Sequence, residues 1–419
     1  MFVTTSLLTW LPTYFHRFDG LAMDAAGMKA SSIMILAIVG APLGGFLSDA
    51  WMKKRENARL LFPVLFLVGI GIVMVYSASS ALALKKYGNS YFFIKKQAMF
   101  AVVGLMALVV GRHFPYRGLR LLAYPAVALT LGLLLAVHLT GFGHSAGGAT
   151  RWLRIGGFTL QPAELARMAM ILYLAYSMSK KQDRIREFSI GFVPHIMVLT
   201  VLIIPIMLQP DFGSVVILTL ITGLMLFVGG VPLRYLALAG LAAAPVGGYL
   251  LLSADYRLKR LMSFLDPWEY PTSDGYQTIH SLMAFGSGGL WGTGIGKSLQ
   301  KLFYLPEPHT DFIFSVIGEE FGLVGVTMIV MLYGLIIWRG IAIARQTTDP
   351  FGALLSFGLT TAIALQVCIN MGVTMGLLPT KGLTLPFLSY GGTSLVLNMA
   401  AVGVLMNIGI SPWLKRKPR

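Results

Sequence analysis

The chain has 419 residues, of which 56% are hydrophobic and only 12% are charged. Soluble domains carry roughly 25% charged residues, so this composition excludes an ordinary soluble enzyme. The 33 Lys and Arg residues exceed the 17 Asp and Glu residues, which gives a net charge of +16. In a membrane protein such cations gather in cytoplasmic loops, so we attribute the excess to topology and expect no nucleic-acid partner. The sequence predicts an all-α, polytopic membrane protein.

Apolar runs of spanning length recur along most of the chain. A helix that crosses a bilayer needs about 20 predominantly apolar residues. Clusters of Gly, Pro and charged residues separate the runs, as expected of loops. We predict ten core helices, at 60–80, 92–111, 119–139, 164–179, 189–208, 212–230, 234–253, 314–338, 351–371 and 392–410. The largest polar stretch, 254–313, is then a loop between the seventh and eighth helices.

The basic residues of the loops predict the orientation of the chain. Five clusters fall on one side if the ten helices alternate in direction: 53–59, 112–120, 180–186, 339–345 and 415–419. One lysine-rich segment, 85–96, falls on the opposite side. The positive-inside rule assigns the side with five clusters to the cytoplasm. The polar segments around 140–163, 254–313 and 372–391 therefore face outward, where ATP is absent.

The first 57 residues differ from the rest of the chain. The segment GGFLSDAWMKKR (44–55) resembles a loop motif of major facilitator transporters, through Gly45, Asp49, Lys53 and Lys54, although Ala50 stands where that family has Arg. We predict an N-terminal appendage with one or two extra helices (1–57), a membrane domain (58–411) and a basic cytoplasmic tail (412–419).

Ionisable side chains near membrane depth are costly and are usually paired or functional. Glu164 and Arg167 follow Pro162 at the start of a predicted helix, and their spacing of three places them on one face. They form either a structural ion pair or part of a site. Asp211 lies in a break between two apolar runs, next to Gln209. It either makes a turn or projects into a cavity.

Asp311 immediately precedes an apolar helix, in the segment PEPHTDFIF. An aspartate at this position either caps the helix or, if desolvated, gains proton affinity and serves as a general base. The neighbouring carboxylates Glu319 and Glu320 need partners within a bilayer. Lys381 is a lone cation in an apolar outward loop, and is either solvated or a contact for an anionic lipid headgroup.

One segment resembles a phosphate-binding loop and the chain has several histidines, but neither forms a complete binding motif. GSGGLWGTGIGKS (286–298) resembles a phosphate-binding loop, but Trp291 stands where the first glycine of that motif is required. The seven histidines show no metal-ligand spacing.

Taken together, the segments VMVYSASS (73–80), QPAE, QPDFGS, GYQTIHSLMAFGSGGLWGTGIGKSLQK (275–301), PEPHTDFIFSVIGEE (306–320) and LPTKGLTLPFLSYGG (378–392) resemble, in order and spacing, the SEDS family of peptidoglycan glycosyltransferases. The resemblance covers roughly 60–411, and the last segment is similar to the FtsW branch, which acts in division. One departure is Arg167, where the family usually has lysine.

The resemblance implies an inverting polymerisation of lipid II on the extracytoplasmic face, with release of undecaprenyl pyrophosphate. Asp311 matches the essential carboxylate of the family and is expected to act as the base. Lys381 and Arg151 are expected to stabilise the leaving pyrophosphate, with a divalent cation (Mg or Mn) as a further expectation. The remaining expected substrate-binding residues are Glu164, Arg167, Gln209, Asp211, His309 and Thr310.

The resemblance also implies a place in the cell. We expect a multi-pass protein of the bacterial inner membrane at the division septum, in contact with membrane lipids. The expected partners are a class B penicillin-binding protein (FtsI-like) and the division proteins FtsQ, FtsL, FtsB and FtsN. Two alternatives stay open: a lipid II flippase or other transporter, and a scaffold for division proteins.

Overall fold

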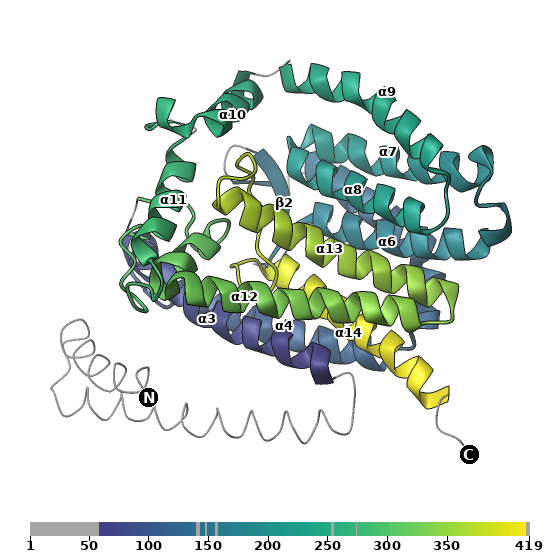
Figure 1. The fold of residues 1–419 in the computed structure, drawn as a ribbon, viewed down its shortest axis with the longest axis horizontal. Helices are drawn as coiled ribbons and strands as arrows, with labels where there is room; N and C mark the ends of the chain where they lie inside the picture. Colours follow the sequence, from purple (N-terminus) through teal and green to yellow (C-terminus); the bar gives the residue numbers. More distant parts are fainter. Residues whose placement is uncertain are drawn as a thin grey trace. The chain divides into compact units, whose positions relative to one another are not determined.

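The computed structural model describes residues 58–415, apart from gaps at 140–142, 147–148, 156–157, 253–254, 274 and 303. The predicted appendage (1–57) and the second half of the predicted tail (416–419) lie outside the described residues. The chain divides into two compact units, Met1–Phe62 and Pro63–Arg419. The second unit contains the helical bundle (Figure 1).

The described residues form twelve α-helices, and ten of them coincide with the predicted runs. They are α3 (Ala58–Tyr87), α4 (Phe92–His113), α5 (Ala123–Leu139), α6 (Pro162–Lys180), α7 (Val193–Leu208), α8 (Phe212–Val228), α9 (Leu233–Leu252), α10 (Asp255–Leu265), α11 (Tyr276–Gly288), α12 (Ile313–Gln346), α13 (Pro350–Thr374) and α14 (Gly392–Lys415). The short helices α10 and α11 lie within the predicted outer loop and were not expected.

Seven segments in the described part of the chain are long and apolar enough to cross a membrane: Leu60–Tyr87, Phe92–His113, Tyr116–His138, Phe188–Leu208, Ile313–Gln346, Pro350–Thr374 and Gly392–Ile410. Helix α8 is apolar but has only 17 residues. Helix α6 carries Glu164 and Arg167 and packs against α5, α8 and α13. Because protein rather than lipid surrounds much of α6, its composition need not be as apolar as that of a lipid-facing span.

Helix α14 packs along α4 through small residues, while α13 lies between α12 and α6 (Figure 1). A Cβ atom on Gly403 would lie 2.3 Å from the carbonyl oxygen of Leu108, and one on Gly111 would lie 2.9 Å from that of Ala400. The two backbones therefore approach closely only because these positions are glycine, as is common between membrane helices.

The helices place polar residues at the two ends of the bundle. At one end, Arg120 bonds both carboxylate oxygens of Asp349, at 2.7 and 2.8 Å. At the same end, Asn407 accepts from the backbone N–H of Tyr116 and donates to the carbonyl of Arg112. The predicted basic clusters of 112–120, 180–186 and 339–345 lie at the ends of α4, α6 and α12 that meet here. The opposite end collects the starts of α6, α8, α12 and α14.

A small antiparallel sheet, ordered β1-β2-β3, connects α5 to α6. Its strands are β1 (Gly143–Ala146), β2 (Ala149–Ile155) and β3 (Phe158–Leu160), and Leu153 pairs with Leu160 across the last two. The sequence analysis expected only a loop here. The sheet matters for the site because β2 carries Arg151.

Helix α12 is interrupted at Gly322, whose φ of 64° and ψ of −163° suit only glycine. The freed N–H groups of Leu323 and Val324 donate to the carbonyls of Gly289 and Leu290, at 2.9 and 3.2 Å. The segment that follows α11 is thereby fastened to α12 by backbone hydrogen bonds.

The adjacent carboxylates of α12 have the partners that the sequence analysis required. Lys301 donates to Glu320 at 2.7 Å and to the hydroxyl of Ser77 at 2.9 Å, and all three side chains are buried. Glu319 accepts from the backbone N–H groups of Leu299 and Gln300 and from the hydroxyl of Ser298. These bonds hold the 298–301 segment against α12, ten residues before Asp311.

The variant K301M should destabilise the bundle because it leaves Glu320 as a buried, unpaired charge, at a cost of about 3–5 kcal/mol. Thermal unfolding in detergent would show a lowered midpoint, and K301M/E320L should recover at least half of the loss. The control is R184A, because the Arg184–Glu187 pair is exposed (64% and 47%) and contributes little. Equal destabilisation by K301M and R184A would contradict this account.

Candidate active site

Asp311 lies just before α12, and its side chain is half-buried. The residue at the cap position of the helix is Phe312, so Asp311 does not cap α12 and that alternative is wrong. Burial raises the pKa of the Asp311 carboxyl to about 7, with a further rise from Glu307 and an opposing effect from Arg151. A carboxyl group that titrates near neutral pH has the proton affinity that a general base requires.

Gly382 approaches Asp311 from the loop between α13 and α14, and Lys381 directly precedes it in the chain. A Cβ atom on Gly382 would lie only 3.0 Å from Oδ2 of Asp311, so the loop backbone runs directly beside the carboxylate. The Nζ atom of Lys381 lies 5.4 Å from the ring centroid of Phe212, the first residue of α8. Burial lowers the pKa of the Lys381 ammonium, and Asp211 opposes that effect. Lys381 is therefore partly desolvated rather than a free loop lysine.

Arg151 links the small sheet to the start of α8. Its Nε donates to the carbonyl of Gln209 at 3.1 Å, and its Nη2 donates to that of Pro210 at 2.6 Å. Both bonds go to backbone carbonyls rather than to a carboxylate, and the positive charge of Arg151 lowers the pKa of Asp311. The two hydrogen bonds therefore hold the Arg151 guanidinium at the end of the bundle where Asp311 lies.

Asp211 caps α8, which supports the turn interpretation. Its carboxylate accepts from the backbone N–H of Ser214 at 3.2 Å and from the hydroxyl of Ser214 at 2.7 Å. Its Oδ2 also accepts from Gln161 at 3.4 Å, so the same group joins the starts of α6 and α8. The Gln209 side chain is only 1% exposed and donates to the carbonyl of Leu134. Its burial favours support of the loop over contact with a substrate.

Glu164 and Arg167 lie one turn apart at the start of α6. Their closest charged atoms are 3.9 Å apart, and their side chains are 11% and 7% exposed. Two buried charges at this distance neutralise each other through space without an ideal hydrogen bond. The geometry therefore supports a structural ion pair, and direct contact with a substrate stays a prediction.

The His309 side chain is 3% exposed and packs between aromatic rings, 4.4 Å from the centroid of Phe93 and 5.6 Å from that of Tyr390. Burial lowers the pKa of the imidazole to about 4, so His309 is neutral. The backbone N–H of Tyr390 donates to the carbonyl of His309, and the hydroxyl of Thr310 donates to that of Glu307. Their roles as substrate contacts stay predictions, because these bonds mainly fix the backbone before Asp311.

The sequence analysis missed two amide side chains on α13. The Nδ2 atom of Asn370 donates to the carbonyls of Asp311 and Leu383, and the Nε2 atom of Gln366 donates to Thr384. Both side chains are 1% exposed. Their sequence signal is two amides, four residues apart, in an otherwise apolar helix.

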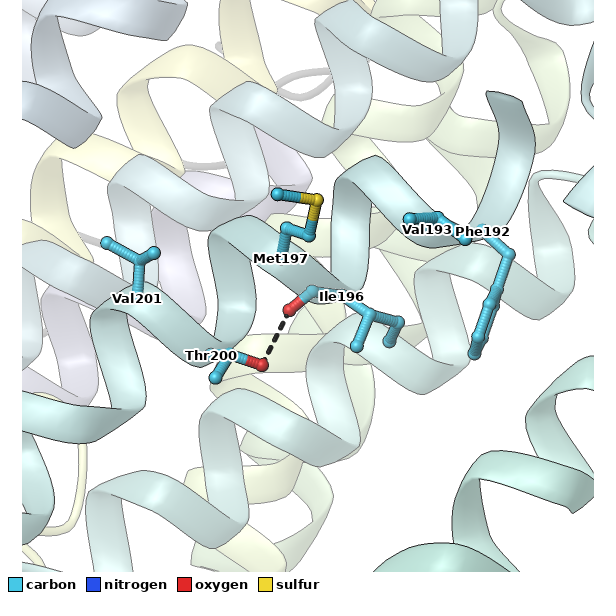
Figure 2. A pocket seen from close by; sticks show the side chains of 6 residues that line it. All are labelled: Phe192, Val193, Ile196, Met197, Thr200 and Val201. Carbon is cyan, nitrogen blue, oxygen red and sulfur yellow. Dashed lines mark hydrogen bonds between the residues drawn. The ribbon is translucent and has the colours of Figure 1, made fainter. Parts of the chain in front are cut away.

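The next features are the possible metal ligands and the surface depressions of the described residues. The described residues contain no group of three His, Cys, Asp or Glu side chains that could hold an ion. An open apolar depression lies instead on η3 (Phe188–Phe192) and α7 (Figure 2). In Figure 2 the one polar lining group, Thr200, donates to the carbonyl of Ile196 in its own helix. Without an ionisable lining, this depression suits lipid chains rather than chemistry.

The fold and the polar cluster define a multi-pass membrane protein with ionisable groups gathered where its helix ends meet. A family model described as "Cell cycle protein", which covers FtsW, RodA and SpoVE, matches residues 58–411. The chain belongs to this family, which is the SEDS family of the sequence analysis.

Individual relatives agree with this assignment. The chain is 44% identical over 355 residues to a peptidoglycan glycosyltransferase FtsW of Geobacter sulfurreducens, a match that covers 85% of this chain and 95% of the relative. It is 43% identical over 356 residues to stage V sporulation protein E of Bacillus subtilis, covering 85% and 97%.

Solved structures share the fold. A chain from a peptidoglycan synthase complex that coordinates polymerisation and crosslinking aligns with a TM-score of 0.70 and 28% identity, covering 84% of this chain and 97% of that chain. The rod shape determining protein RodA of Thermus thermophilus aligns with a TM-score of 0.63 at the same identity, covering 84% and 96%. These matches confirm the predicted all-α polytopic fold.

The titration of Asp311 can be tested without an activity assay, because carbodiimides modify protonated carboxyl groups. Labelling of Asp311, measured by mass spectrometry, should fall as the pH rises through about 7. E307Q should move the midpoint to lower pH because Glu307 raises the pKa, and R151A should move it to higher pH because Arg151 lowers the pKa. Labelling confined to pH values below 5 would contradict the raised pKa.

Proposed function

We propose that this peptidoglycan glycosyltransferase polymerises lipid II into glycan strands, with Asp311 as the general base. The names of its relatives support the reaction class. The observation that carries the proposal is the half-buried Asp311 carboxylate, whose pKa is raised to about 7, beside the Lys381–Leu383 loop. A transporter needs no such base, so this geometry favours an enzyme over the flippase alternative.

The proposed step is a single displacement. Asp311 takes the proton from the 4-hydroxyl of the acceptor sugar, and the resulting oxygen nucleophile attacks the anomeric carbon of the donor. The new bond forms between that carbon and oxygen while the bond to the lipid pyrophosphate breaks, which inverts the anomeric centre. Undecaprenyl pyrophosphate leaves with the bonding electrons, and the donor needs no ATP because it arrives activated.

Lys381 and Arg151 are the proposed stabilisers of charge on the leaving pyrophosphate. A cation in a partly desolvated position interacts more strongly with developing negative charge than a cation in water. Lys381 has this environment, and its aliphatic chain is held near Phe212 and Gly213 at the start of α8. Asp211 and the Glu164–Arg167 pair are proposed to shape and orient the substrate cavity.

A divalent cation stays an expectation for this site. Mg²⁺ is often bound by one or two carboxylates together with substrate phosphates rather than by a protein cage. The described side chains do not form a cage of three ligands, so no step of the proposed reaction is assigned to a metal.

The proposed setting is the cytoplasmic membrane at the division septum, with the site facing outward. The likeness to a chain from a synthase complex supports pairing with a class B penicillin-binding protein of the FtsI type. Contacts with FtsQ, FtsL, FtsB and FtsN are proposed with the septal role.

The variant D311N should lower the rate of glycan polymerisation by about 100-fold or more, because a general base contributes 10²–10⁴-fold. The assay is the purified full chain, reconstituted with lipid II and a class B penicillin-binding protein, with polymer resolved on gels. D183N is the matched control, since Asp183 is exposed and lies in the segment that follows α6.

Wild-type polymerisation by D311N would reject the proposed base. Labelled lipid II that crosses a liposome bilayer without any polymer product would instead favour the flippase.

A further inference from the structure

We propose that Asn370 is a positioning residue that fixes the backbone of the Lys381–Leu383 segment relative to the backbone of Asp311. The inference rests on the proposed function, because it assigns catalytic work to the two segments that Asn370 joins. Asn370 itself does not touch the reacting atoms.

The amide group of Asn370 bonds both segments at once. Its Nδ2 atom donates to the carbonyl of Asp311 at 2.9 Å and to the carbonyl of Leu383 at 2.5 Å. An amide nitrogen carries two hydrogens, so these two bonds use its full donor capacity. The side chain is 1% exposed, which keeps water from competing for either carbonyl.

A second amide extends this tie along the loop. Gln366 precedes Asn370 by four residues on α13, so both side chains project from the same face. The Nε2 atom of Gln366 donates to the carbonyl and to the hydroxyl of Thr384, at 2.9 and 3.2 Å. Two successive turns of α13 therefore hold successive residues of the loop.

These bonds fix the position of the loop backbone relative to the backbone of Asp311. With Leu383 bonded to Asn370, Gly382 lies against the carboxylate of Asp311, where a Cβ would be 3.0 Å from Oδ2. Lys381 is the next residue. A displacement of about 1 Å in such an arrangement can lower a rate by about 100-fold, even when the fold is kept.

A contact that does not involve Asn370 also joins the two segments. The hydroxyl of Ser389 donates to the carbonyl of Thr310 at 2.5 Å and accepts from the backbone N–H of Leu385 at 2.8 Å. This contact joins the same two segments, one residue away from Asp311 on one side and two residues beyond Leu383 on the other. Loss of Asn370 should therefore loosen the spacing of Asp311 and Lys381 without detaching the loop.

The test uses N370L, which cannot donate, and N370D, which has the same shape without the amide hydrogens. Both variants of the full chain are assayed with lipid II and a class B penicillin-binding protein. We expect kcat to fall by about 100-fold while KM for lipid II changes by about threefold or less. The control is T360V, because Thr360 is a buried residue of α13 whose hydroxyl donates to the carbonyl of Ser356 in its own helix.

A double-mutant cycle with K381A separates positioning from a purely structural role. If Asn370 acts by fixing the loop backbone that carries Lys381, N370L should lower the rate of K381A by about threefold or less, since coupled sites are not additive. Fully multiplicative losses would overturn the proposal, as would wild-type kcat in N370L. Loss of folded protein in both Asn370 variants, measured by thermal unfolding, would assign the residue to the fold alone and overturn it too.

Failure of the proposed function gives a different pattern. Wild-type rates in both D311N and K381A would reject the proposed function. The positioning role of Asn370 would then be rejected as well, because it rests on that function. A loss in D311N and K381A with no loss in N370L would reject only the role of Asn370.

Discussion

Keeping a carboxylate half-buried where helix ends meet raises the free energy of its charged form, and this desolvation gives Asp311 its proton affinity. The surrounding charges adjust the balance in opposite directions, with Glu307 raising the pKa and Arg151 lowering it. The segments packed around Asp311 keep its side chain partly out of water. The proposed chemistry depends on that partial burial, because a fully solvated aspartate would be a weak base.

These segments are held together by bonds between positions far apart in the sequence. The Lys301–Glu320–Ser77 cluster joins α12 to α3 and to the segment before Asp311. Asn370 joins Asp311 to the loop of Lys381. Arg151 brings the small sheet to the start of α8. Each bond involves a buried or partly buried polar group, whose loss would leave an unsatisfied partner.

Much of this organisation could be predicted from the sequence. Ten apolar runs predicted ten helices, because hydrophobic length depends only on local sequence. The position of Asp311 before an apolar helix pointed to the candidate base. The small sheet was missed because its strands have three to seven residues and lie in a segment predicted only as loop. Asn370 was missed because its importance comes from two carbonyls that are 59 and 13 residues away, which no local pattern reveals.

The most direct measurement of the central claim is the pH dependence of kcat/KM for lipid II polymerisation by the reconstituted full chain. Because the base must be ionised to accept a proton, the rate should rise as the pH increases through about 7, the pKa of Asp311. E307Q should shift this rise to lower pH. A rate that is already maximal at pH 5 and unaffected by E307Q would contradict a desolvated Asp311 as the group that takes the proton.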